Sequence, residues 1–169
     1  MNLTRQRYDH STRVLVAVAG LLASTATLQA QASLQASWDT ACEAGTCSVS
    51  RSVVEANTGS TVATFLVAVE QGSDAITAGA LVPLGTATEP GLRLVHGATE
   101  VEVPIQVCFP DGCRALTALP SGALEAIDAA GTVEVRFFPW SAEQPLAVPV
   151  PTAGLVQAVS AAREQLASP

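Results

Sequence analysis

Residues 105–119 read IQVCFPDGCRALTAL, and this stretch predicts an antiparallel β-hairpin. Two strand candidates flank its centre, Ile105–Phe109 and Cys113–Leu119. The Pro-Asp-Gly sequence at 110–112 is typical of a turn, because proline presets φ, aspartate tolerates the next position and glycine can take a positive φ. Cys108 and Cys113 stand on either side of this turn, so a disulfide can close the tip of the hairpin.

The four cysteines form two C-x4-C pairs, Cys42 with Cys47 and Cys108 with Cys113, and three pairings are possible in principle. Five residues of extended chain would separate the two Cα atoms by roughly 16 Å, so a local disulfide needs a chain reversal. In the first pair Gly45 can provide it. A short loop stabilises by about 2 kcal/mol, against more than about 4 kcal/mol for a long crossed pairing. We expect the local pairing, which has the easier geometry.

Zinc binding and redox catalysis are the other uses of paired cysteines. Two C-x4-C pairs could ligate zinc, but the leader described below sends the chain to an oxidising compartment, which favours disulfides. A thioredoxin-type site needs a C-x-x-C sequence, which the chain does not have. We therefore expect two disulfides, no bound metal and no cofactor.

Alternation of apolar and polar residues continues on both sides of the hairpin and predicts a mainly β fold of about eight short strands, typical of a sandwich. The segment 132–138 alternates strictly, with Val133, Val135 and Phe137 on one face. The other strand candidates are Cys47–Val54, Thr61–Val69, Ala80–Leu84, Leu92–Val95, Thr99–Val103 and Leu146–Val150.

Two segments have helical patterns. A short helix is expected up to Ala130, with Ser121 as its N-cap and Gly131 as its stop. A longer C-terminal helix is expected from Thr152, as N-cap, to about Ala167.

The first 32 residues predict a cleaved secretory signal peptide. Three arginines precede the apolar segment Val14–Leu22, and Ala30-Gln31-Ala32 is an A-x-A cleavage site that would start the mature chain at Ser33. The apolar segment is much shorter than the ~20 residues that span a bilayer, so we expect no stable membrane insertion after cleavage. Residues 33–169 are predicted to form a single domain in the periplasm or at the cell surface.

Charge excludes one class of partner. Without residues 1–32 the chain keeps five arginines against fourteen acidic residues, a net charge of −9. Such a surface repels phosphate backbones, so we expect no nucleic-acid binding.

An ordered set of tryptophan, cysteine and turn residues resembles the invasion-associated locus B family of exported bacterial proteins. The matching residues, spread over about 37–166, are Trp38, Cys42, Cys47, Pro83-Leu84-Gly85, Pro90-Gly91, Cys108, Gly112-Cys113, Gly131 and Gly154-Leu155. The resemblance implies an immunoglobulin-like β-sandwich with periplasmic or surface exposure. It carries over no catalytic residues, because the matching residues are structural.

Acid–base chemistry has few candidates. His96 is the only histidine after the leader, and it is expected in an exposed turn before Gly97, with no nucleophile-elbow sequence in the chain. Glu100 and Glu102 lie two residues apart and share one strand face, while Val101 and Val103 fill the other, so the two acids are expected on the solvated side.

Phe138 and Trp140 are the candidate partner-binding residues. Both continue the outer face of the strand at 132–138, so a regular strand would present two aromatic rings outward. Pro139 interrupts the strand, and either ring could instead fold into the core.

These patterns favour a non-enzymatic envelope protein that acts through contacts with an unidentified protein of the envelope or of a host cell. A carrier of a small ligand or metal is the alternative. A hydrolase or thiol oxidoreductase would need a reactive nucleophile or an open cysteine pair, and neither is evident in the sequence.

Overall fold

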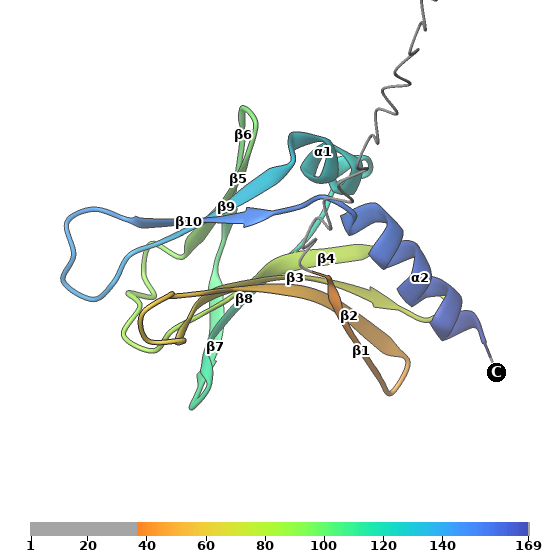
Figure 1. Ribbon diagram of the computed structural model, residues 1–169, viewed down its shortest axis with the longest axis horizontal. Helices are drawn as coiled ribbons and strands as arrows, with labels where there is room; N and C mark the ends of the chain where they lie inside the picture. Colours follow the sequence, from red (N-terminus) through yellow and green to blue (C-terminus); the bar gives the residue numbers. More distant parts are fainter. Residues whose placement is uncertain (1–36, 169) are drawn as a thin grey trace, which may run out of the picture. The chain divides into compact units, whose positions relative to one another are not determined.

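The cysteine-tipped hairpin forms one edge of a six-stranded antiparallel sheet in the computed structural model, which describes residues 37–168 (Figure 1). The strand order across this sheet is β1 (Asp39–Glu43), β2 (Thr46–Val54), β3 (Thr61–Glu70), β4 (Ile76–Val82), β8 (Gly112–Ala118) and β7 (Ile105–Phe109). The predicted signal peptide and the boundary at residue 33 lie outside the described residues.

A four-stranded antiparallel sheet forms the second layer (Figure 1). Its order is β10 (Leu146–Pro151), β9 (Thr132–Phe137), β5 (Leu92–His96) and β6 (Thr99–Val103). Helix α1 (Ala123–Ala130) connects β8 to β9, and helix α2 (Leu155–Ala167) follows β10. The predicted class, a mainly β sandwich with one short helix and a C-terminal helix, is confirmed.

The core consists mainly of aliphatic side chains from the inner faces of the two sheets. In β9, Val133, Val135 and Phe137 are buried as predicted. Strand β3 shows the same alternation, and its Phe65 is the largest fully buried side chain. The other large side chains with almost no exposed surface are Leu92, Leu94, Ile127, Leu155, Val49, Val67, Val69, Val82, Val103, Val133 and Val135.

Two strands differ from the sequence prediction. β1 was not predicted, because all five of its residues are exposed and its pattern carries no buried face. It is held by pairing with β2 across a two-residue turn, in which Ala44 and Gly45 have φ of 48° and 80°. Such turns match the twist of a hairpin. β4 begins at Ile76 instead of Ala80, because small residues in its middle are buried and give no alternation.

The predicted N-caps of both helices were wrong, whereas Gly131 ends α1 as predicted. Gly122, with φ of 79°, precedes α1, and no side chain caps that helix. Thr152 is fully buried, and its hydroxyl donates to the carbonyl oxygen of Ile127 at 2.8 Å. The cap of α2 comes from Asp128 in α1, whose Oδ1 accepts the backbone N–H of Leu155 at 3.0 Å.

Removing this cap between the helices is expected to destabilise the protein. The N–H of Leu155 also donates to the carbonyl oxygen of Thr152 at 3.0 Å, so Asp128→Ala removes one of its two acceptors. The free energy of unfolding should fall by about 0.5–1 kcal/mol in a urea titration, the lower range for the loss of a helix cap. Asp128→Asn keeps an acceptor oxygen and is expected to cost less than half as much. Equal losses in the two variants would show that the hydrogen bond to Leu155 contributes nothing.

Candidate partner-binding surface

Trp140 is placed by a short strap that follows β9. Beyond Phe137 the chain makes a single bridge between Pro139 and Thr86, in the segment that connects β4 to β5. The N–H of Trp140 donates to the carbonyl oxygen of Gly85 at 2.6 Å, and the N–H of Ala87 donates to that of Phe138 at 2.8 Å. These two backbone hydrogen bonds make up the bridge and hold this segment to its neighbour.

The two predicted aromatic residues have different surroundings. The side chain of Trp140 is 77% exposed, while Phe138 is only half-buried in the strap. Regular alternation ends at Phe137, because Pro139 cannot donate a hydrogen bond and the chain turns at Ser141, with φ of 63°. Both rings were expected to point outward, but only the ring of Trp140 is largely exposed.

Two further exposed apolar side chains lie in segments that neighbour the strap or pair with β9. Leu84 is 56% exposed and precedes Gly85, whose carbonyl accepts from Trp140. Leu146 is 42% exposed and lies opposite Phe137 in the pairing of β10 with β9. We call Leu84, Trp140 and Leu146 the Trp140 patch. The sequence indicated Leu84 only as the end of the strand candidate Ala80–Leu84, within the sequence Pro83-Leu84-Gly85.

The other tryptophan after the leader has a structural role. Trp38 Nε1 donates to the carbonyl oxygen of Ala153 at 3.1 Å, and its ring lies edge-on to Phe65 at 6.2 Å. The guanidinium of Arg51 lies 4.3 Å from the centre of the Trp38 ring and donates to the Pro151 carbonyl at 2.6 Å. Burial lowers the pKa of Arg51, and nearby Asp39 acts in the opposite direction. These contacts tie β2 to the connection before α2.

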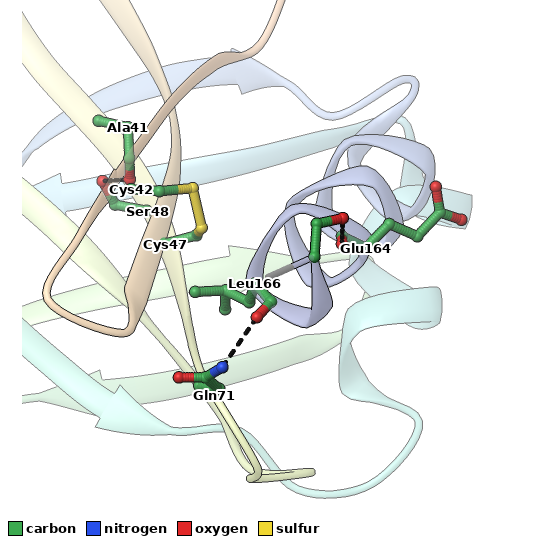
Figure 2. The surroundings of a disulfide bond; sticks show 8 residues. Ala41, Cys42, Cys47, Ser48, Gln71, Glu164 and Leu166 are labelled. Atoms are coloured by element: carbon green, nitrogen blue, oxygen red, sulfur yellow. Dashed lines mark hydrogen bonds between the residues drawn. A yellow bond between two sulfur atoms is a disulfide. The ribbon is translucent and has the colours of Figure 1, made fainter.

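Both disulfides have the local pairing expected from the sequence, Cys42 with Cys47 and Cys108 with Cys113. In each case the two cysteines are directly opposite across a hairpin. Figure 2 shows the first disulfide between β1 and β2, with Gln71 nearby donating to the carbonyl oxygen of Leu166 in α2 at 3.0 Å. All four sulfur atoms are bonded in these two pairs.

His96 does not lie in an exposed turn, as the sequence had suggested. It is the last residue of β5, it is only 7% exposed, and it faces inward with Leu92 and Leu94. The inward alternation of β5 extends one residue further than predicted, and the turn itself consists of Gly97 and Ala98.

Glu100 and Glu102 lie on the outer face of the four-stranded sheet, as predicted. Arg93 binds Glu100 at 2.7 Å and Glu102 at 3.4 Å. Arg136 contacts Glu134 at 2.7 Å and Glu100 at 3.7 Å. The acidic side chains therefore form an ion-pair network with two arginines, which is the arrangement of a solvated sheet face.

Comparison with known proteins identifies the family. A family model described as invasion associated locus B (IalB) protein matches residues 27–163. The chain belongs to this family. A search of curated proteins gives no match. The crystal structure of invasion associated protein B from Bartonella henselae matches with a TM-score of 0.67 at 20% identity, over 78% of this chain and 94% of that one.

The family assignment confirms the resemblance carried by the cysteines, Trp38 and the turn glycines, and the solved structure supports the same sandwich fold. Membership of a family of exported proteins agrees with the predicted leader. Within residues 37–168, no helix is both long and apolar enough to cross a membrane.

Proposed function

We propose that this protein is an exported, non-enzymatic component of the bacterial envelope that binds another protein through the Trp140 patch. The observation that carries the proposal is Trp140 itself, a large ring that is 77% exposed on a segment fixed by backbone hydrogen bonds. Tryptophan is enriched among the residues that dominate binding energy at protein interfaces. A segment that is already fixed loses little conformational freedom on binding.

The surroundings support a protein partner over a nucleic acid or an anionic membrane. The chain after the predicted cleavage site has a net charge of −9, which opposes association with phosphate groups. The name of the Bartonella henselae relative associates that protein with invasion. A host-cell protein is therefore one candidate partner for this chain, and an envelope protein is the other.

A photo-crosslinking experiment in the producing cells tests the patch. A photoreactive amino acid at Leu84 should give a discrete crosslinked product, and Trp140→Ala should abolish it, because losing a central aromatic contact typically costs about 2 kcal/mol or more of binding free energy. If the partner is on a host cell, the same product should form only when host cells are added.

Ala129 provides the control, because it is exposed in α1, which precedes β9, whereas the strap follows β9. Ala129→Ser should leave the product unchanged, and a photoreactive residue at 129 should not form it. Trp140→Ala should change the free energy of unfolding by less than about 0.5 kcal/mol, as for other exposed substitutions. A product that persists in Trp140→Ala would refute the proposal.

A further inference from the structure

Strand β7 is the least protected edge of the two sheets formed by residues 37–168. An open edge carries unpaired N–H and C=O groups, and it pairs readily with another strand unless charge or proline prevents this. The edge strands β1 and β6 each carry two acidic side chains, and the edge strand β10 contains two prolines. Strand β7, which lies beyond β8 in Figure 1, reads IQVCF and has neither. An incoming strand would therefore meet no charge and no missing donor within β7.

The backbone of Cys108 points toward the open side of β7. Phe109 and Gly112 face each other across a two-residue turn, so they form a hydrogen-bonded pair. Such pairs alternate with non-hydrogen-bonded pairs in antiparallel strands, and Cys108 with Cys113 is the next pair along. The Cα atoms of these two cysteines are 3.9 Å apart, closer to the ~4.5 Å of a non-hydrogen-bonded pair than to the ~5.5 Å of a bonded one. The N–H and C=O of Cys108 are thus directed away from β8.

The side chains on either side of Cys108 are apolar and exposed. Val107 is 41% exposed and Phe109 is 44% exposed. Val107 lies opposite Arg114, whose guanidinium lies 4.8 Å from the centre of the Phe109 ring, so all three share the outer face of the six-stranded sheet. Arg114 also pairs with Asp111 at 2.9 Å. The hairpin tip therefore has no net charge, although the chain after the predicted cleavage site has a net charge of −9.

We propose that β7 pairs in antiparallel orientation with β7 of a second copy of this chain, so that the two six-stranded sheets continue into each other across a two-fold axis. Cys108 then faces Cys108 of the second copy, and the two exchange N–H···O=C hydrogen bonds. Val107 lies opposite Phe109 of the second copy, so both exposed apolar side chains gain a cross-strand contact. A second copy fits because it brings a neutral edge with the same apolar pair, whereas its other edges would bring carboxylates or prolines.

The interface is small. A bulge between Ile105 and Val107 ends the regular part of β7, and the Gln106 side chain there already donates to the carbonyl oxygen of Leu116 at 2.9 Å. The buried area is therefore below the ~1,200 Å² of a standard interface, and we expect a Kd of about 10–100 μM. Two acidic chains also repel each other, so dimerisation should strengthen as salt is added. This inference goes beyond the proposed function, since a dimer would carry two Trp140 patches.

Sedimentation equilibrium of the processed protein tests the dimer. Val107→Glu should raise the Kd at least about tenfold, because it places a carboxylate against Phe109 of the second copy, while within one chain it faces Arg114. Ala41→Glu is the matched control: it adds the same charge to the outer face of β1, one residue before the other exposed cysteine. It should change the Kd by less than about threefold. A protein that stays monomeric at about 1 mM, or equal weakening in the two variants, would overturn the proposal.

Amide hydrogen exchange tests the same pairing without a substitution in β7. The N–H of Cys108 should exchange more slowly at about 500 μM protein than at about 5 μM, because pairing gives it an acceptor. The N–H of Cys42, at the equivalent position beside the two-residue turn of β1 and β2, should exchange at the same rate at both concentrations. Exchange at Cys108 that does not depend on concentration would overturn the proposal. Trp140→Ala should leave dimerisation unchanged, and a dimer lost in that variant would place the contact at the Trp140 patch instead.

Discussion

Gly79→Ala is expected to lower the free energy of unfolding by more than about 4 kcal/mol, an exceptional loss for a single methyl group. Gly79 lies in the middle of β4, between β3 and β8, opposite Leu66 and Leu116. A Cβ atom at this position would overlap the carbonyl oxygen of Ala115 and lie 2.8 Å from the Cα of Leu116. Both are backbone atoms that cannot rotate away, so β4 and β8 would have to separate.

Urea unfolding followed by circular dichroism measures this loss, and Gly59→Ala is the control. Gly59 lies in the turn between β2 and β3 with φ of 70°, and a Cβ atom there would have no neighbour within 4 Å. Only backbone strain remains, so the control should cost about 1–2 kcal/mol. If Gly59→Ala protein folds and Gly79→Ala protein cannot be recovered in a folded form, the result agrees with the expectation. Similar losses of unfolding free energy in the two variants would contradict the close approach of β4 and β8.

The features that the sequence predicted well are local ones. The strict alternation at 132–138 determines which side chains of β9 are buried, because successive residues of a strand face opposite sides. The turn at 110–112 places Cys108 opposite Cys113 without help from the rest of the chain. The same local logic predicted that Glu100 lies on the solvated face.

The features that the sequence did not predict depend on contacts between distant segments. Asp128 caps a helix that begins 27 residues later, and no local pattern shows this. The close approach at Gly79 depends on the position of β8, and the burial of His96 depends on where α1 packs. For the candidate site, strand register indicated that Trp140 points outward, but the strap that fixes it depends on Gly85, in a separate connection.

Phe65→Ala is expected to lower the free energy of unfolding by about 3–5 kcal/mol, the usual cost of removing a fully buried phenylalanine ring. Phe65 has no exposed surface and lies in β3, where its ring meets the edge of Trp38. Aromatic residues make up only 4% of the chain, so the core has few large side chains. Its direct partners across the sheet are Arg51 in β2 and Ala80 in β4. The Arg51 guanidinium is held by the Pro151 carbonyl and the Trp38 ring, and Ala80 is too short to fill the space left behind.

Phe109→Ala makes the same chemical change at the edge of the same sheet and serves as the matched control. Its ring is 44% exposed and contacts the Arg114 guanidinium at 4.8 Å, so its loss should cost only about 1 kcal/mol or less. In a Trp140→Phe background, Trp38 is the only tryptophan after the predicted leader, and its fluorescence should respond to Phe65→Ala but not to Phe109→Ala. Equal losses of stability in the two variants would contradict a stabilising contact between the Phe65 and Trp38 rings. A Trp38 fluorescence signal that does not respond to Phe65→Ala would contradict it as well.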